Sequence, residues 1–364
     1  MSQDEITRRD FARQTAGVAA GAALASALAD QAVAKPAAVD TSKILNYNPK
    51  MGYRRLGKTG EMISEIGLGG HWKTRSGGRY WASFPGDNPP PDVQMNRNQV
   101  WTKAAELGIN YYDITTSGEA AIYGRCAKTT GIKLHIGYSD HVLCIRNPKN
   151  RTVAGMMKEI DEGLRRLLVE QMFLWRPQAL MGGGHTKEEL DLVLEAYEKA
   201  HKQGKVKYMG MSAHSHDFAR SVLEQYGQHY HAFVFMYTVS NEPKQSQSLF
   251  DTLRQKDVGA VGLKPFHGNG YFRSLVRKAT KEGVEPDLNA AAIQGLKKIL
   301  QVPEMTCSIP GMTTVDEVEN NVKASYDRQT QLTQAELEEV QAWARASLDE
   351  LPFDYQWIRD QIYV

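Results

Sequence analysis

The stretch NYYDITTSGEAAIYGR, residues 110–125, places a carboxylate where a buried strand ends. INYYDI has the apolar and aromatic content of a strand, and the small polar residues after it are typical of a turn that leads into a helix. Asp113 lies at the junction. A carboxylate held there can act as an acid, as a base or as the partner of a cation. Asp113 is therefore the first candidate catalytic residue.

Histidines and aromatic side chains also follow strand-like runs, and each group suggests a different function. Zinc accepts nitrogen and oxygen ligands, so histidines beside Asp113 or Glu119 could form a metal site. Loop histidines more often lie exposed or only line a pocket, so we assign no metal ligand. Aromatic residues around a lid at residues 73–92 favour a protein that binds a sugar or another small ligand. The histidines are His71, His185, His214, His216 and His267, and the aromatic residues are Trp72, Tyr80, Trp81 and Trp175.

The elements that must position these residues alternate between strand-like and helix-like segments. Helical patterns over residues 153–168 and 187–204 are the clearest, and the second ends at Gly204. Eight such repeats predict an α/β fold, a (β/α)8 TIM barrel with an N-terminal β-hairpin and a C-terminal helical tail. An open doubly wound sheet is the alternative, but GLGGHW lacks the GxGxxG spacing that it requires. The expected strands are residues 63–70, 109–114, 140–146, 171–177, 206–212, 231–238, 259–266 and 305–311.

Several motifs are similar to those of the aldo/keto reductase superfamily, in the family's order. The similarity covers residues 51–323. It implies a barrel that binds NADPH and moves a hydride between the nicotinamide and a carbonyl group. It also implies a tetrad of Asp, Tyr, Lys and His, in which the Tyr is the general acid. The motifs are YRRLGKTGEMISEIGLGG, GINYYD, GKVKYMGMS, LKPF and SIPGMTTVDEVENN.

The resemblance places the tetrad on a sequence that departs from it. Asp113 matches the family's Asp, but Gly118 stands where the Tyr is expected, and Tyr123 is the nearest substitute. The Lys position falls on Arg146, which could pair with Asp113 in a bidentate manner. The His position falls on Trp175, which donates one N–H but cannot change its protonation state. The four candidate catalytic residues are therefore Asp113, Arg146, Tyr123 and Trp175.

The resemblance also implies a nucleotide site at the ends of the later strands. Glu317 stands where an Arg is common in the family, and its carboxylate should repel a 2′-phosphate, so NADP(H) and NAD(H) both stay open. The C-terminal segment contains no Cys, so no iron–sulfur cluster of the kind some relatives carry is expected. The expected cofactor-binding residues are Ser212, Lys264, Thr313, Thr314 and Asn321.

The N-terminal residues 1–34 have the layout of a signal peptide. Arg8 and Arg9 precede a mildly apolar, Ala-rich run that ends in AVA at Ala34, which favours the twin-arginine export machinery as a partner. The run is too short for a stable membrane span. We expect export to the periplasm or the extracellular space. A linker at residues 35–50, a barrel at 51–330 and the helical tail at 331–364 would come after it.

Composition limits the other function classes. The chain has 364 residues, 41% of them hydrophobic, and a net charge of +2, with no Lys/Arg cluster that would bind nucleic acid. Cys126, Cys144 and Cys307 are widely spaced, so we expect buried free thiols. The family resemblance, together with the N-terminal leader, implies an exported oxidoreductase with NAD(P)H-linked carbonyl chemistry on a small-molecule substrate at an atypical site. A catalytically silent barrel that binds a sugar-like ligand and a histidine-rich metal-dependent enzyme are the alternatives.

Overall fold

A computed structural model describes residues 40–70, 72, 87–351 and 353–364. Contacts divide the chain into two units, Met1–Lys43 and Ile44–Val364. In the first unit, the described residues include a short 3-10 helix at Thr41–Lys43. The second unit contains the barrel. The expected signal peptide, His71, Tyr80 and Trp81 lie outside the described residues.

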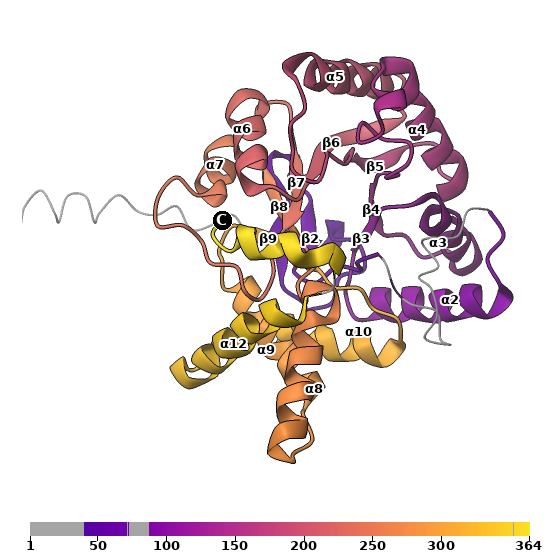
Figure 1. Cartoon of the computed structure of the whole chain (residues 1–364). Coiled ribbons are helices and arrows are strands. Elements are labelled where there is room, and N and C mark those ends of the chain that lie inside the picture. The colour runs from indigo at the N-terminus through magenta and orange to yellow at the C-terminus, as the bar shows by residue number, and fades with distance from the viewer. Residues whose placement is uncertain (1–39, 71, 73–86, 352) are drawn as a thin grey trace, which may run out of the picture. The chain divides into compact units, whose positions relative to one another are not determined.

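Seven parallel strands form one sheet in chain order (Figure 1). Residues 66–69 take the eighth position, because Ile66 bridges to Ser308 on one side and Leu68 bridges to Tyr112 on the other. A Cβ at Gly69 would lie 2.3 Å from the carbonyl oxygen of Ile309, so glycine permits this close approach. The predicted (β/α)8 barrel is confirmed. The strands are β3 Tyr111–Ile114, β4 His135–Tyr138, β5 Met172–Trp175, β6 Val206–Ala213, β7 Ala232–Met236, β8 Gly259–Leu263 and β9 Met305–Ile309.

The predicted N-terminal hairpin is also present. β1 Tyr53–Arg55 pairs antiparallel with β2 Met62–Ser64. The expected first strand at residues 63–70 is therefore two pieces, the second hairpin strand and the bridging segment that closes the barrel.

Helices surround the strands (Figure 1). Thr116, Thr152 and Thr186 begin α3, α4 and α5 by accepting a hydrogen bond from a backbone N–H of the first turn. The two predicted helices are confirmed as α4 and α5, and Gly204 follows α5 with a φ of 72°. No helix of the described residues is long and apolar enough to cross a bilayer. The helices are α2 Pro91–Glu106, α3 Ser117–Thr130, α4 Val153–Leu167, α5 Lys187–Lys202, α6 His216–Tyr226, α7 Leu249–Lys256, α8 Gly270–Glu282, α9 Leu288–Leu300, α10 Val315–Asn321, α11 Lys323–Tyr326 and α12 Gln334–Ser347.

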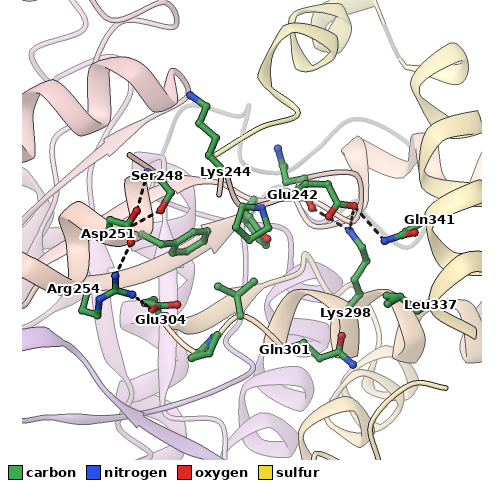
Figure 2. A pocket seen from close by; sticks show the side chains of 16 residues that line it. Glu242, Lys244, Ser248, Asp251, Arg254, Lys298, Gln301, Glu304, Leu337 and Gln341 are labelled. Carbon is green, nitrogen blue, oxygen red and sulfur yellow. Dashed lines mark hydrogen bonds and ion pairs between the residues drawn. The ribbon is translucent and has the colours of Figure 1, made fainter. Parts of the chain in front are cut away.

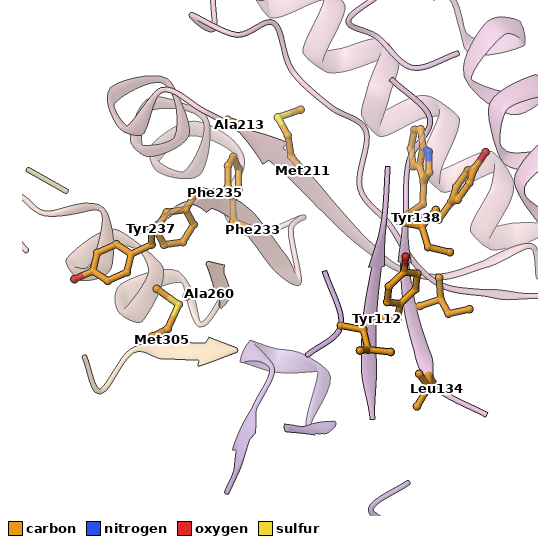
Figure 3. Close-up of a cluster of buried hydrophobic side chains, with 14 of the residues drawn as sticks. Tyr112, Leu134, Tyr138, Met211, Ala213, Phe233, Phe235, Tyr237, Ala260 and Met305 are labelled. Carbon is orange, nitrogen blue, oxygen red and sulfur yellow. The ribbon is translucent and has the colours of Figure 1, made fainter. Parts of the chain in front are cut away.

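Alternate strand residues belong to two different cores. Tyr111 and Leu174 lie in a small cluster inside the barrel, whereas Tyr112 and Trp175 belong to the large cluster between the strands and the helices. Figure 3 shows part of the large cluster, with Tyr112 among its labelled side chains. The period of two along a strand therefore decides which residues can face the barrel mouth.

The third predicted strand was wrong. Residues 140–146 form turns, and the strand is β4, which ends at Tyr138. Asp140 organises the turns, since its Oδ1 accepts hydrogen bonds from the backbone N–H groups of Val142 (2.8 Å) and Leu143 (3.2 Å). The run HVLC has strand-like residues, but this side-chain capping ends the extended backbone before it.

Candidate active site

Asp113 forms a buried ion pair with Arg176 at the C-terminal end of the barrel. Nε of Arg176 donates to Oδ1 of Asp113 at 2.7 Å, and Nη2 donates to Oδ2 and to the carbonyl oxygen of Ile114. The Tyr111 hydroxyl donates to the same carboxylate at 3.1 Å. Burial raises the pKa of Asp113 to about 6, although Arg176 opposes the shift. The pair fixes both groups, so Asp113 orients Arg176 and is not a free acid.

Arg146 does not pair with Asp113, contrary to the expectation from the sequence. It follows the turns after β4, and its Nε donates to the carbonyl oxygen of Ala179 at 3.0 Å. The position directly after the third barrel strand is Ser139, because that strand ends at Tyr138. Arg146 nevertheless lines the same cleft as Asp113. The sequence predicted the right neighbourhood for Arg146 but the wrong partner.

Trp175 points away from the barrel mouth. Its Nε1 donates to Oε2 of Glu159 on α4 at 3.3 Å, and its ring lies in the core under the helices. The next residue, Arg176, faces inward because side chains alternate along β5. Trp175 therefore cannot contact a substrate in the cleft, and the prediction of a catalytic or aromatic-binding role for it was wrong.

Tyr123 is enclosed under α3. Its ring lies 4.1 Å from that of Tyr112 and 5.3 Å from that of Trp101, measured between centroids, and the side chain is fully buried. It does not line the cleft. The helix begins at Ser117, so Tyr123 lies in its second turn and faces the core instead of the mouth. Tyr123 does not replace the family's tyrosine in this arrangement.

A large cleft opens at the C-terminal ends of the strands, with a volume of about 1140 Å³. Asp113, Arg146, Ser212 and Lys264 line it. Burial and the nearby Arg146 lower the pKa of Lys264 to about 8. The backbone of Lys264 has a φ of 60°, which is unusual and strained for a residue other than glycine. The chemistry of a (β/α)8 barrel is located at this end of the strands.

The residues predicted to bind a nucleotide largely meet in this cleft. Ser212, Lys264, Thr313 and Asn321 line it, while the Thr314 side chain caps α10 by accepting from the N–H of Glu317 at 3.2 Å. The Glu317 carboxylate in turn accepts hydrogen bonds from the backbone N–H groups of residues 313 and 314. A carboxylate thus occupies the start of α10, beside Thr313.

The C-terminal segment also reaches the cleft, which the sequence did not predict. Tyr355 and Trp357, in the 3-10 helix Phe353–Gln361, are lining residues. The Tyr355 hydroxyl lies 3.5 Å from Nζ of Lys264, and the Trp357 ring lies 4.8 Å from that of His214. A Cβ at Gly268 would lie 2.9 Å from Cζ of Tyr355, so this glycine makes room for the phenol. Tyr355 is the tyrosine among the described lining residues.

The histidines do not assemble a metal site among the described residues, where no group of three His, Cys, Asp or Glu side chains could hold an ion. His185 donates to Glu189 at 2.7 Å, and His216 donates to the carbonyl oxygen of Met236 at 2.6 Å. His267 is buried against Ser347 and two further hydroxyl groups. Among these, His214 lines the cleft. Burial and nearby cations hold its pKa well below the usual range.

A second, smaller hollow of about 380 Å³ lies between α7, α9 and α12 (Figure 2). Lys298 contacts Glu242 at 3.3 Å and donates to the carbonyl oxygens of Val239 and Asn241. Arg254 bridges Asp251 and a second carboxylate. These charged groups already have partners, so the hollow is held together by its own ion pairs.

The three cysteines are free and buried, as expected. Burial raises the pKa of the Cys126 and Cys144 thiols to about 12, so neither is a reactive thiolate near neutral pH.

Comparison with known proteins identifies the family. The chain is 23% identical over 335 residues to an uncharacterized oxidoreductase, YqkF, of Bacillus subtilis (strain 168), which covers 81% of this chain and 97% of that protein. The structure resembles the holo form of the aldo-keto reductase AKR11C1 from Bacillus halodurans, with a TM-score of 0.57 and 19% identity. The match covers 81% of this chain and 97% of that protein. It also resembles the thermostable aldo-keto reductase Tm1743 in complex with the inhibitor epalrestat, with a TM-score of 0.57 and 18% identity. This match covers 80% of this chain and 100% of that protein. The aldo/keto reductase family profile matches residues 93–299, and this chain belongs to that family.

Proposed function

We propose that this chain is an exported oxidoreductase that uses NAD(P)H to interconvert a carbonyl group and an alcohol on a small molecule. The observation that carries the proposal is the cleft itself. It brings Ser212, Thr313 and Asn321, at nucleotide-binding positions of the family resemblance, together with Asp113 at the matched tetrad position. The leader with Arg8 and Arg9 supports export.

The cleft residues fit a nicotinamide nucleotide. Ser212 and His214 lie at the end of β6, and Nδ1 of His214 is buried with no hydrogen-bond partner among the described residues. A carboxamide carries both donors and acceptors and would satisfy this nitrogen as well as the Ser212 hydroxyl. When bound, the nucleotide supplies or accepts the hydride. Thr313 and Asn321 would hold its far end.

The tetrad is atypical, so the proton must come from another group. Tyr355 is positioned for this role, because its hydroxyl contacts Lys264 and its ring lies under the same ammonium at 4.8 Å. A cation beside a phenol stabilises the phenolate, so Tyr355 can give a proton to a carbonyl oxygen and recover one from water. Lys264 would tune the phenol, and the Asp113–Arg176 pair would form the floor of the site.

Activity of Tyr355→Phe tests this assignment. Purified mature protein would be supplied with NADH or NADPH and a panel of aldehydes and ketones, and nucleotide oxidation would be followed. Loss of the acid should lower kcat by roughly 10²–10⁴-fold and leave nucleotide affinity unchanged. Phe353→Leu is the matched control for a general disturbance of the tail, because Phe353 lies in the same 3-10 helix but is exposed and does not line the cleft. Equal kcat for wild type and Tyr355→Phe would remove Tyr355 from the mechanism.

The two alternative functions have weaker support. A metal-dependent enzyme would need ligands that converge, whereas His185, His216 and His267 are directed to separate partners. A silent binding barrel would bind nucleotide or ligand and show no turnover with any carbonyl compound or alcohol, so the same assay separates it from the proposal.

A further inference from the structure

The cleft carries an excess of positive charge. Its described lining includes five cationic side chains and three carboxylates, an excess of two positive charges. The location of each charge decides whether this excess is relevant to a ligand. The cations are Arg146, Arg176, Lys264, Arg273 and Arg277, and the carboxylates are Asp113, Glu317 and Glu350.

The three carboxylates are already engaged. Asp113 pairs with Arg176, and Glu350 pairs with Arg277. Glu317 accepts hydrogen bonds from two backbone N–H groups at the start of α10. None of the three is therefore free to compensate a further cation.

Three cations remain without a carboxylate partner among the described residues. Arg273 is exposed and donates to the backbone carbonyl oxygen of Glu350, whereas Arg146 and Lys264 are partly buried. Nε of Arg146 donates a hydrogen bond to the carbonyl oxygen of Ala179. Among the residues that the structure describes, its two terminal nitrogens have no hydrogen-bond partner. Nζ of Lys264 contacts the Tyr355 hydroxyl at 3.5 Å. Burial and the nearby Arg146 lower the pKa of Lys264, while burial and the nearby Arg176 lower the pKa of Arg146.

Charged groups taken out of water are costly unless an opposite charge compensates them. The strained backbone of Lys264 is a second, independent sign, because such conformations concentrate at functional sites. An anion that enters the cleft would relieve the repulsion, and a guanidinium group can hold a carboxylate through two parallel N–H bonds.

We propose that Arg146 and Lys264 bind a carboxylate of the substrate, so that the cleft takes an anionic carbonyl compound or the corresponding hydroxy acid. This inference rests on the proposed function and names its substrate class. In a 2-oxo acid the carbonyl group is adjacent to the carboxylate. A carboxylate at Lys264 therefore places the carbonyl oxygen close to Tyr355, which contacts the same ammonium group.

Binding without nucleotide tests the proposal separately from turnover. Isothermal titration calorimetry of the mature protein would use two matched pairs, pyruvate with neutral hydroxyacetone and glucuronate with neutral glucose. Inorganic pyrophosphate would be titrated as well, because a nucleotide cofactor could supply the anion instead. The variants are Arg146→Gln and Lys264→Met, and Arg277→Gln is the matched control because that arginine lines the same cleft but has its own carboxylate.

The expected result is binding of at least one carboxylate with at least about tenfold preference over its neutral partner. Arg146→Gln and Lys264→Met should each weaken this binding by about tenfold or more, while Arg277→Gln leaves it unchanged. Arg146→Lys and Lys264→Arg keep the charge and serve if the first variants do not fold. Equal affinity for charged and neutral members, or equal binding by wild type and the variants, would overturn the proposal. Binding of pyrophosphate alone would also overturn it and would assign the two cations to the nucleotide.

Discussion

Removal of the Asp113 carboxylate should destabilise the barrel strongly, because it leaves Arg176 buried without a counter-charge. Both side chains are almost completely enclosed, with exposed fractions of 1% for Arg176 and 3% for Asp113. In Asp113→Ala, Arg176 would keep one strong partner, the carbonyl oxygen of Ile114 at 2.6 Å. The Tyr111 hydroxyl would also lose its acceptor.

Loss of one partner of a buried ion pair costs about 3–5 kcal/mol. Each kcal/mol lowers the thermal midpoint of a chain of this size by about 2 °C, so the midpoint should fall by roughly 6–10 °C. Replacement of both partners, as in Asp113→Leu with Arg176→Met, should recover much of this loss because no buried charge remains. The double variant therefore separates the cost of an unpaired charge from the cost of a damaged core.

Urea unfolding at pH 7.5 would measure the differences in free energy, and a thermal scan would measure the midpoints, both followed by circular dichroism. Arg55 and Asp257 form the matched control, since they also make a bidentate pair, at 2.7 and 2.8 Å, but both are half exposed. Asp257→Asn should cost less than about 1 kcal/mol. Arg146→Gln should not reproduce the loss seen for Asp113→Ala. A change below about 1 kcal/mol in Asp113→Ala would refute the reasoning about burial.

Three further predictions concern a buried acid, the cofactor and export. Burial raises the pKa of Glu159 to about 7, above its value of 4.5 in the unfolded chain, so the folded protein binds the extra proton and stability should fall as pH rises from about 4.5 to 7. The free energy of unfolding of the wild type, measured with urea, should be lower at pH 8 than at pH 5, and Glu159→Gln should reduce this difference by roughly 2–3 kcal/mol. The same difference in wild type and variant would contradict the prediction. Glu317→Ala should improve the affinity for NADPH relative to NADH by about tenfold in fluorescence titrations, because a carboxylate beside Thr313 is removed, while the exposed Glu319→Gln leaves the ratio unchanged. Arg8→Lys with Arg9→Lys should stop export, and unchanged periplasmic delivery would argue against a twin-arginine signal.

The sequence predicted the barrel well, because each strand and helix carries its own local signals. Apolar runs with β-branched and aromatic residues predicted seven of the eight strand positions. Thr186 caps the start of α5, and Gly204 follows its end, as is typical of residues that begin and end helices. The exception is the segment at residues 140–146, where the Asp140 side chain caps turns across an apolar run. A local pattern cannot show which carboxylate will form such a cap.

The site was harder to predict, because its contacts join distant segments. Asp113 and Arg176 are 63 residues apart, and the sequence assigned Arg146 as the partner because the third strand was placed too late. The alternation of side chains on β5 would have directed Trp175 outward and Arg176 inward, had the register of that strand been known. Tyr355 is 91 residues from Lys264, and no local pattern marks that contact.

Nucleotide binding tests the central claim most directly. The mature protein would be titrated with NADH and NADPH while the fluorescence of the reduced nicotinamide is followed, with Ser212→Ala and Asn321→Ala as variants that line the cleft. The proposed function predicts saturable binding of at least one nucleotide in the micromolar range, weakened by both variants. No binding at millimolar nucleotide would contradict it and would leave a family barrel that binds some other ligand.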